Sequence, residues 1–130
     1  MFVHCGIFFD RNADTTGGMN FYASVHRLGY HFNAPTMNQT WGWDSGLSIS
    51  NATWTMCALT VNATTVKAYL FTSSSTPSTT SNNPSSPHSS TNFANIRLGR
   101  DAFSESRSYK GDIGHALFYS STLTDNEIMQ

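Results

Sequence analysis

Two tryptophans that flank one glycine, Trp41 and Trp43, are the residues of this chain best suited to binding chemistry. Flat aromatic rings stack on the apolar faces of sugars, and fixed polar groups nearby hold the sugar hydroxyls. Asp44 follows directly, and His31 and Asn33 lie shortly upstream. These five residues predict a site for carbohydrate. A structural alternative stays open, in which either tryptophan covers one end of the hydrophobic core.

Three oxygen-bearing residues alternate at Asp10, Asn12 and Asp14, a spacing that could direct three ligands toward one Ca²⁺ ion. Backbone carbonyls of the turn that follows would complete the coordination shell. An EF-hand loop is excluded, because Phe21 stands at the twelfth place, where such a loop needs a glutamate. Calcium is the one cofactor that the sequence suggests, against the alternative that these residues only solvate a turn.

The acidic residues form no pair suited to catalysis. Hydrolysis of a glycosidic bond needs two carboxylates about 5 to 9.5 Å apart. The chain has 8 acidic residues, and those that are close in sequence fall in predicted turns, where solvation and capping explain them. We therefore expect no enzymatic activity.

The two cysteines, Cys5 and Cys57, each lie within an apolar alternating run. Small buried thiols are the ordinary expectation at such positions. A disulfide between them is the alternative, since sequence alone cannot place the two within bridging distance. No Cys-x-x-Cys motif is present to complete a tetrahedral zinc site.

Length and charge restrict the classes of partner. Charged residues make up 12% of the 130 residues and the formal net charge is -1, so the chain carries no field that would hold a nucleic-acid backbone. We therefore expect no nucleic-acid partner. Every apolar run is far shorter than the roughly 20 residues that cross a bilayer, which predicts no membrane insertion. The length suits a single domain over residues 1–130.

Alternating apolar and polar residues, separated by clusters of Gly, Asn, Ser and Thr, predict an all-β antiparallel sandwich of the jelly-roll kind. The expected strands cover residues 2–10, 19–24, 27–33, 54–61, 65–71, 93–99 and 111–119. Residues 34–46 are expected to form a long loop that carries the two tryptophans. The Ser-, Thr- and Pro-rich segment 72–92 predicts a mobile surface loop, since it can bury little apolar area. A helical turn with a capping box is expected at 124–127.

The alternation also predicts which residues form the core. Two aromatic residues in strand patterns, Trp54 and Tyr69, are expected to be structural. The core residues expected from the two sheets are Ile7, Phe9, Cys57, Leu59, Ile113 and Leu117.

Four consecutive motifs in the C-terminal third resemble the ending of laminin G-like jelly rolls. In that family a strand ending in a glycine turn leads to a Lys-Gly turn, a further strand and a closing Leu-x-x-x-Glu-Ile turn. The corresponding motifs are NIRLGRD (95–101), YKGDI (109–113), ALFY (116–119) and LTDNEI (123–128). WTMCALTV (54–61) and TVKAYL (65–70) are similar to the family's central hairpin, and LGYH (28–31) and WGWDSGL (41–47) to segments of its bacterial members.

The resemblance implies the concanavalin A-like lectin and glucanase sandwich, two antiparallel sheets packed over one core. It also implies a non-catalytic recognition module, carbohydrate-binding or adhesive, in an extracellular or cell-surface protein. Its partner would be a glycan or another surface protein. The family's opening strand or strands have no counterpart in this sequence, which predicts an exposed sheet edge. The alternative function is therefore a structural or assembly module that pairs with another chain through that edge, a homo-oligomer included.

Overall fold

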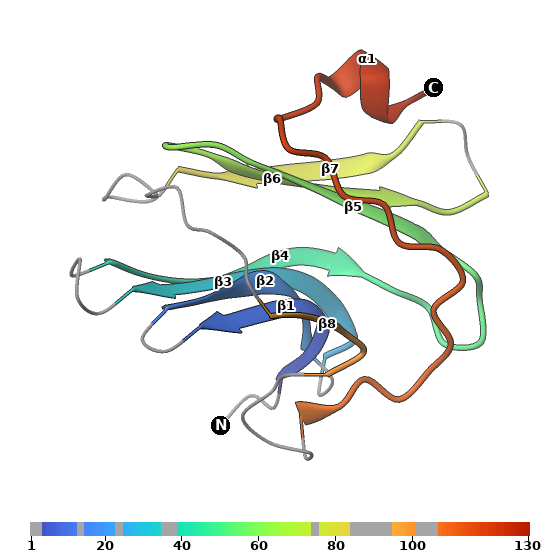
Figure 1. The fold of residues 1–130 in the computed structure, drawn as a ribbon. Helices are drawn as coiled ribbons and strands as arrows, with labels where there is room; N and C mark the ends of the chain where they lie inside the picture. Colours follow the sequence, from blue (N-terminus) through green and yellow to red (C-terminus); the bar gives the residue numbers. More distant parts are fainter. Residues whose placement is uncertain are drawn as a thin grey trace.

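The strands of the chain form two antiparallel sheets that stack face to face (Figure 1). The computed structural model describes residues 4–12, 15–22, 25–34, 39–73, 76–83, 95–100 and 107–130. Each ladder between two of its strands is antiparallel. The predicted all-β antiparallel sandwich is confirmed.

The larger sheet has the strand order β4-β3-β2-β1-β8. Its strands are β1 (His4–Asn12), β2 (Thr15–Tyr22), β3 (Arg27–Ala34), β4 (Gln39–Ser48) and β8 (Ile96–Leu98). The first four form a meander, because each pairs with the next along the chain. β8 returns from much later in the sequence to pair with β1.

The smaller sheet has the order β5 (Met56–Val61), β6 (Val66–Phe71) and β7 (Ser78–Asn82). An Asx turn joins the first two strands. Asn62 Oδ1 accepts hydrogen bonds from the backbone N–H of Thr64 at 2.9 Å and of Thr65 at 2.8 Å. Such local bonds replace the backbone partners that a tight turn leaves unmet.

The hydrophobic core lies between the two sheets. Tyr30 and Phe32 of β3 and Val66 of β6 form a buried cluster, and Leu59 and Val61 of β5 pack against it. Side chains alternate between the two faces of a strand, so the even-numbered positions of β3 define the inner face of the larger sheet. The odd-numbered positions define its outer face.

The short helix α1 (Asp125–Ile128) covers the smaller sheet on the side away from the larger sheet (Figure 1). The Asp125 carboxylate accepts hydrogen bonds from Lys67 Nζ at 2.5 Å and from the Tyr69 hydroxyl at 2.7 Å. The Lys67 ammonium and the Tyr69 hydroxyl lower the pKa of Asp125 below its usual range. Asp125 therefore ties the C-terminal turn to β6.

The capping box predicted at 124–127 is confirmed. Thr124 Oγ1 accepts from the backbone N–H of Glu127 at 3.3 Å, and the Glu127 carboxylate accepts from the backbone N–H of Thr124 at 2.7 Å. These bonds lower the pKa of Glu127. Because a helix this short is unstable alone, the cap and the contact with β6 hold it in place.

Three predictions of secondary structure were wrong. Residues 34–46 are not all loop, because β4 begins at Gln39 and pairs with β3. The segment 72–92 contains β7, which β6 holds through a ladder although its side chains are polar; residues 84–92 lie outside the described part. Residues 111–119 form no strand. Their alternation suits a strand, but no described strand pairs with them.

The predicted core was partly right. Phe9 and Tyr69 are buried, and Leu59 packs against the core cluster. Leu117, however, is 76% exposed, so its assignment to the core was wrong. The physical reason is that residues 111–119 pair with no described strand. Trp54, which was expected to be structural, is 73% exposed. The remaining three predicted core residues are half-buried: Ile7, Cys57 and Ile113.

Candidate functional site

The residues predicted to bind carbohydrate lie on β3 and β4 but do not share one face. Trp43 stands opposite Tyr30 in the ladder, is half-buried, and packs against the core cluster between the sheets. His31 stands opposite Gly42 and points to the outer face, because successive side chains alternate. Trp43 therefore packs in the interior, as the structural alternative proposed, while His31 lies on the other side of the sheet.

The register also places the remaining three residues. Asn33 is two positions from His31 and so shares its face, and Asp44 stands opposite Gly29, also on the outer face. Trp41 stands opposite Phe32, and its side chain lies outside the described part of the structure. Three of the five predicted residues thus share the outer face of the larger sheet: His31, Asn33 and Asp44.

The centre of the outer face is Gly29, where the absence of a side chain makes room for two neighbours from β2. A Cβ on Gly29 would lie 2.3 Å from Cε2 of Tyr22 and 2.6 Å from Oδ1 of Asn20. Both side chains therefore lie over the glycine. We call the surface formed by Asn20, Tyr22, Arg27, His31 and Asp44 the outer polar face.

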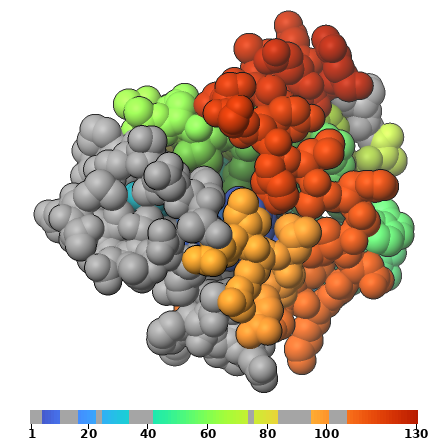
Figure 2. Space-filling view, viewed as in Figure 1, coloured from blue at the N-terminus to red at the C-terminus, as the bar shows by residue number. Residues whose placement is uncertain are grey.

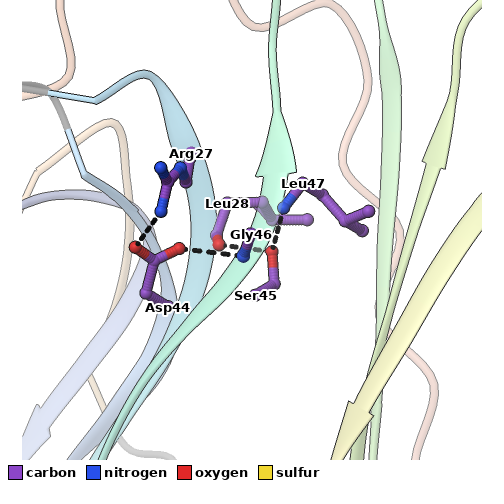
Figure 3. Close-up of polar contacts among 6 residues, drawn as sticks. All are labelled: Arg27, Leu28, Asp44, Ser45, Gly46 and Leu47. Atoms are coloured by element: carbon purple, nitrogen blue, oxygen red, sulfur yellow. Dashed lines mark hydrogen bonds and ion pairs between the residues drawn. The ribbon is translucent and has the colours of Figure 1, made fainter.

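An ion pair borders this face (Figure 3). Arg27 Nη1 donates to Asp44 Oδ2 at 3.1 Å, while the backbone N–H of Gly46 donates to Asp44 Oδ1 at 2.9 Å. Gly46 has φ +76, a conformation that glycine adopts without strain. Because both charged groups are partly exposed, the pair contributes only about 0–1 kcal/mol to stability. Its main effect is to fix the direction in which the guanidinium and the carboxylate point.

Ser45 holds β4 against β3 beside this ion pair. Its hydroxyl donates to the backbone oxygen of Leu28 at 2.6 Å and accepts from the backbone N–H of Leu47 at 3.1 Å (Figure 3). The ladder between β3 and β4 is irregular here, and the buried hydroxyl replaces a missing backbone partner. The bulge therefore keeps a fixed shape, and with it the position of Asp44.

At the other end of the face, His31 stacks on Phe9 with ring centroids 5.9 Å apart and planes 20° apart. Phe9 is buried, so it supports the imidazole from one side. Beside His31, Gly42 is exposed, and a Cβ built there would meet nothing within 4 Å. The His31 ring thus borders the open surface at Gly42.

Buried polar groups complete the face. Asn20 is almost fully buried, and neither atom of its side-chain amide has a hydrogen-bond partner of good geometry within the described residues. Burial raises the pKa of Tyr22, and the nearby Asp44 carboxylate raises it further. The phenol therefore stays protonated at neutral pH. Asn20 and Tyr22 therefore fill the space over Gly29, and the partly exposed charged groups of the face are those of Arg27 and Asp44.

The calcium prediction falls partly outside the described residues. Asp10 is buried and accepts a hydrogen bond from the backbone N–H of Asn95 at 2.5 Å. The side chain of Asn12 and the whole of Asp14 lie outside the described part. Among the residues that the structure describes, no group of three or more His, Cys, Asp or Glu side chains is placed to hold a metal ion. Calcium binding stays a prediction.

Both cysteines are free thiols in the structure. Cys5 lies in β1 of the larger sheet and Cys57 in β5 of the smaller sheet. Burial raises the pKa of both thiols, that of Cys57 to about 11. At neutral pH such a high pKa keeps the Cys57 thiol protonated, so Cys57 is a poor nucleophile.

The sequence did not identify Asn20, Tyr22 or Arg27 as site residues. Each lies within a strand pattern or at its end, and no local motif sets it apart. They meet Asp44 only through the registers of two consecutive hairpins, Asn20 opposite Gly29 and Gly29 opposite Asp44. Pairing the predicted strands residue by residue is the one signal that could have found them.

A family model for the concanavalin A-like lectin/glucanases superfamily matches residues 4–129. The chain belongs to this superfamily. Within it, laminin G-like domains are generally non-catalytic and usually extracellular, and many bind carbohydrate or mediate adhesion. Comparisons of this laminin G-like domain with curated proteins and with solved structures found no match. The one described helix lacks the length and apolar character needed to cross a bilayer.

Proposed function

We propose that this laminin G-like domain is a non-catalytic recognition module of an extracellular or cell-surface protein, and that it binds carbohydrate on the outer polar face. The observation that carries the proposal is the open surface at Gly42, bordered by the His31 ring and, two residues along β4, by the Asp44 carboxylate. A sugar needs an apolar or aromatic surface and directional polar groups close together. This part of the face supplies both.

The polar groups are pre-oriented. Asp44 is held by Arg27 and by the backbone of Gly46, and His31 is supported by Phe9. A carboxylate and a guanidinium side by side offer an acceptor and several donors, which suits a pair of neighbouring sugar hydroxyls. Groups that are already fixed lose little entropy when they bind, so a shallow site still gives measurable affinity.

The chemistry of this face favours binding over hydrolysis. Retaining and inverting glycosidases both need two carboxylates across the scissile bond. On the outer polar face, as far as the structure describes it, Asp44 is the one carboxylate, and it is paired with Arg27. Family membership supports an extracellular setting, where glycans are abundant ligands.

A glycan array followed by calorimetry with the best-bound oligosaccharide tests the proposal. We expect Asp44→Ala and His31→Ala each to weaken binding by about tenfold, which corresponds to about 1.4 kcal/mol. Thr79→Ala is the matched control, because Thr79 is an exposed residue on β7 of the other sheet. Unchanged affinity in both site variants would overturn the proposed site. Release of reducing ends from the oligosaccharide would overturn the non-catalytic assignment.

A further inference from the structure

The ring of Tyr22 lies at the centre of the outer polar face. In the ladder, Tyr22 of β2 stands opposite Arg27 of β3, yet a Cβ on Gly29 would lie 2.3 Å from Cε2 of Tyr22. The ring therefore leans along the sheet and lies across the glycine. Because Tyr22 is half-buried, part of the ring stays open to solvent. The ring thus offers this face an aromatic surface, which Trp43 does not, since Trp43 packs inward.

Two groups hold the ring in this place. Oδ1 of Asn20 and the backbone oxygen of Trp43 each lie 2.6 Å from the point that a Cβ on Gly29 would occupy. The edge of the ring is therefore bounded by β2 on one side and by β4 on the other. Burial and the Asp44 carboxylate raise the pKa of Tyr22, so the ring carries no charge at neutral pH. An aromatic surface that is already fixed loses little entropy when a ligand stacks on it.

The charged groups beside this ring compensate each other. Arg27 Nη1 lies 3.1 Å from Asp44 Oδ2, and the two side chains leave 41% and 34% of their surface exposed, so a ligand can reach both. A carboxylate or sulfate on the ligand would approach Arg27 only beside the like charge of Asp44, which is costly. A pair of hydroxyls has no such conflict, because one donates to the carboxylate and the other accepts from the guanidinium.

A third charge on this side of the sheet is too distant to change the balance. Among the described side chains on the outer face of the larger sheet, the remaining Arg, Lys, Asp or Glu is Arg97, which stands opposite Phe9. Arg97 is exposed on the edge strand β8, which lies at the surface in Figure 2 (orange). Three strand spacings separate β8 from β3, or about 14 Å at about 4.8 Å each. That distance exceeds the Debye length of about 8 Å at physiological salt, so the charge of Arg97 is largely screened.

We propose that the ligand of the outer polar face is a neutral pyranose, which lays its C–H face on the Tyr22 ring and directs two neighbouring hydroxyls to Arg27 and Asp44. This inference rests on the proposed function and narrows it to one class of sugar. His31 and Gly42 form the next row of the same face, so they border the same ligand.

A glycan array with matched tetrasaccharides tests the class of sugar. It carries neutral hexose tetramers of gluco, manno and galacto configuration, and the uronate tetramers that differ from them only by a carboxylate at C6. We expect a neutral tetramer to bind at least about tenfold more tightly than its uronate counterpart, with an affinity that changes less than about twofold between about 0.05 and 0.5 M NaCl. Tighter binding of a uronate, with an affinity that falls as the salt concentration rises, would overturn the neutral class.

Calorimetry of the full chain with the best-bound tetramer tests the role of the ring. Tyr22→Leu should weaken binding by at least about tenfold, and Tyr22→Phe, which keeps the ring, should restore at least about a third of the wild-type affinity. Phe21→Leu is the matched control, because Phe21 is also half-buried on β2 but points to the opposite face, so the affinity should not change. Urea unfolding of each variant shows whether the sandwich is folded.

The outcomes distinguish this inference from the proposed function. Full affinity in Tyr22→Leu together with a loss in Asp44→Ala would overturn the stacking on Tyr22 and leave the proposed function standing. Equal weakening by Phe21→Leu would overturn the stacking as well. Binding to none of the tetramers would overturn the inference, and binding to no glycan of a general array would overturn the proposed function with it.

Discussion

Gly29 and Gly42 both lie on the outer face of the larger sheet, but the structure predicts opposite effects for an alanine at the two positions. A Cβ at Gly29 would lie 2.6 Å from the backbone oxygen of Trp43, in addition to its close approach to Tyr22 and Asn20. The two side chains could rotate away, but the carbonyl belongs to the ladder between β3 and β4. Relief of the overlap therefore has to separate the strands.

Overpacking of this kind costs about 1–3 kcal/mol, and a backbone clash belongs at the upper end of that range. We therefore expect Gly29→Ala to lower the free energy of unfolding by about 3 kcal/mol. With a urea m-value of about 2 kcal/mol per molar, the midpoint falls by about 1.5 M. At Gly42 a Cβ meets nothing within 4 Å, and replacing a strand glycine by alanine adds about 0.5–1 kcal/mol of stability.

Urea unfolding followed by tryptophan fluorescence measures both midpoints. The Gly42→Ala midpoint should equal or exceed that of the wild type. The same variant should weaken carbohydrate binding by about tenfold, because its methyl group fills open surface beside His31. Equal midpoints for the two variants would refute the packing described around Gly29. Full affinity in Gly42→Ala would refute the position of the site.

Three further predictions concern the core, the C-terminal turn and the thiols. Phe32→Ala, at a fully buried position, should lower the free energy of unfolding by about 3–5 kcal/mol in the same urea assay; a loss below about 1 kcal/mol would contradict the core. Because Lys67 and Tyr69 lower the pKa of Asp125, its stabilisation is present above the unfolded pKa of about 3.9 and disappears as the pH falls through the lower folded value. The melting-temperature difference between wild type and Asp125→Asn should therefore shrink from pH 6 toward pH 2, and a constant difference would contradict the contact. Burial raises the pKa of Cys57 to about 11, so at pH 8 maleimide should label it about a hundredfold more slowly than in the unfolded chain; equal rates would contradict its burial.

Alternation of apolar and polar residues predicted the hairpin of β5 and β6 well, because each strand buries one side chain in two. It failed for β4, where Gly42 and Gly46 suggested a loop. In the structure these glycines lie within a paired strand, one on open surface and the other at a positive φ. β7 was missed because its side chains are polar, and the ladder with β6 rather than burial holds it.

The C-terminal segment shows the opposite error. Residues 111–119 alternate as a strand should, but a strand needs a neighbour, and sequence pattern does not report whether one is present. Leu117 is therefore exposed although its position in the pattern predicts burial. The family resemblance was more reliable than the pattern, since it draws on the order of several motifs along the whole chain.

Two of the five residues that form the outer polar face were named from the sequence alone. His31 and Asp44 could be chosen from residue type and proximity in sequence, and the structure places both on one face. Trp43 could not be assigned to a face before the register was known, and it packs inward. Asn20 and Tyr22 join the site through pairing between strands, which is set by turn geometry and by the whole pattern of burial.

We propose that carbohydrate binds the outer polar face of the larger sheet. An NMR titration of the isotope-labelled chain with its best-bound oligosaccharide tests this most directly. We expect the largest amide shifts at His31, Gly42 and Asp44, with small shifts in β5 and β6. Shifts concentrated on the smaller sheet or on residues 112–121, with those three amides unchanged, would contradict it.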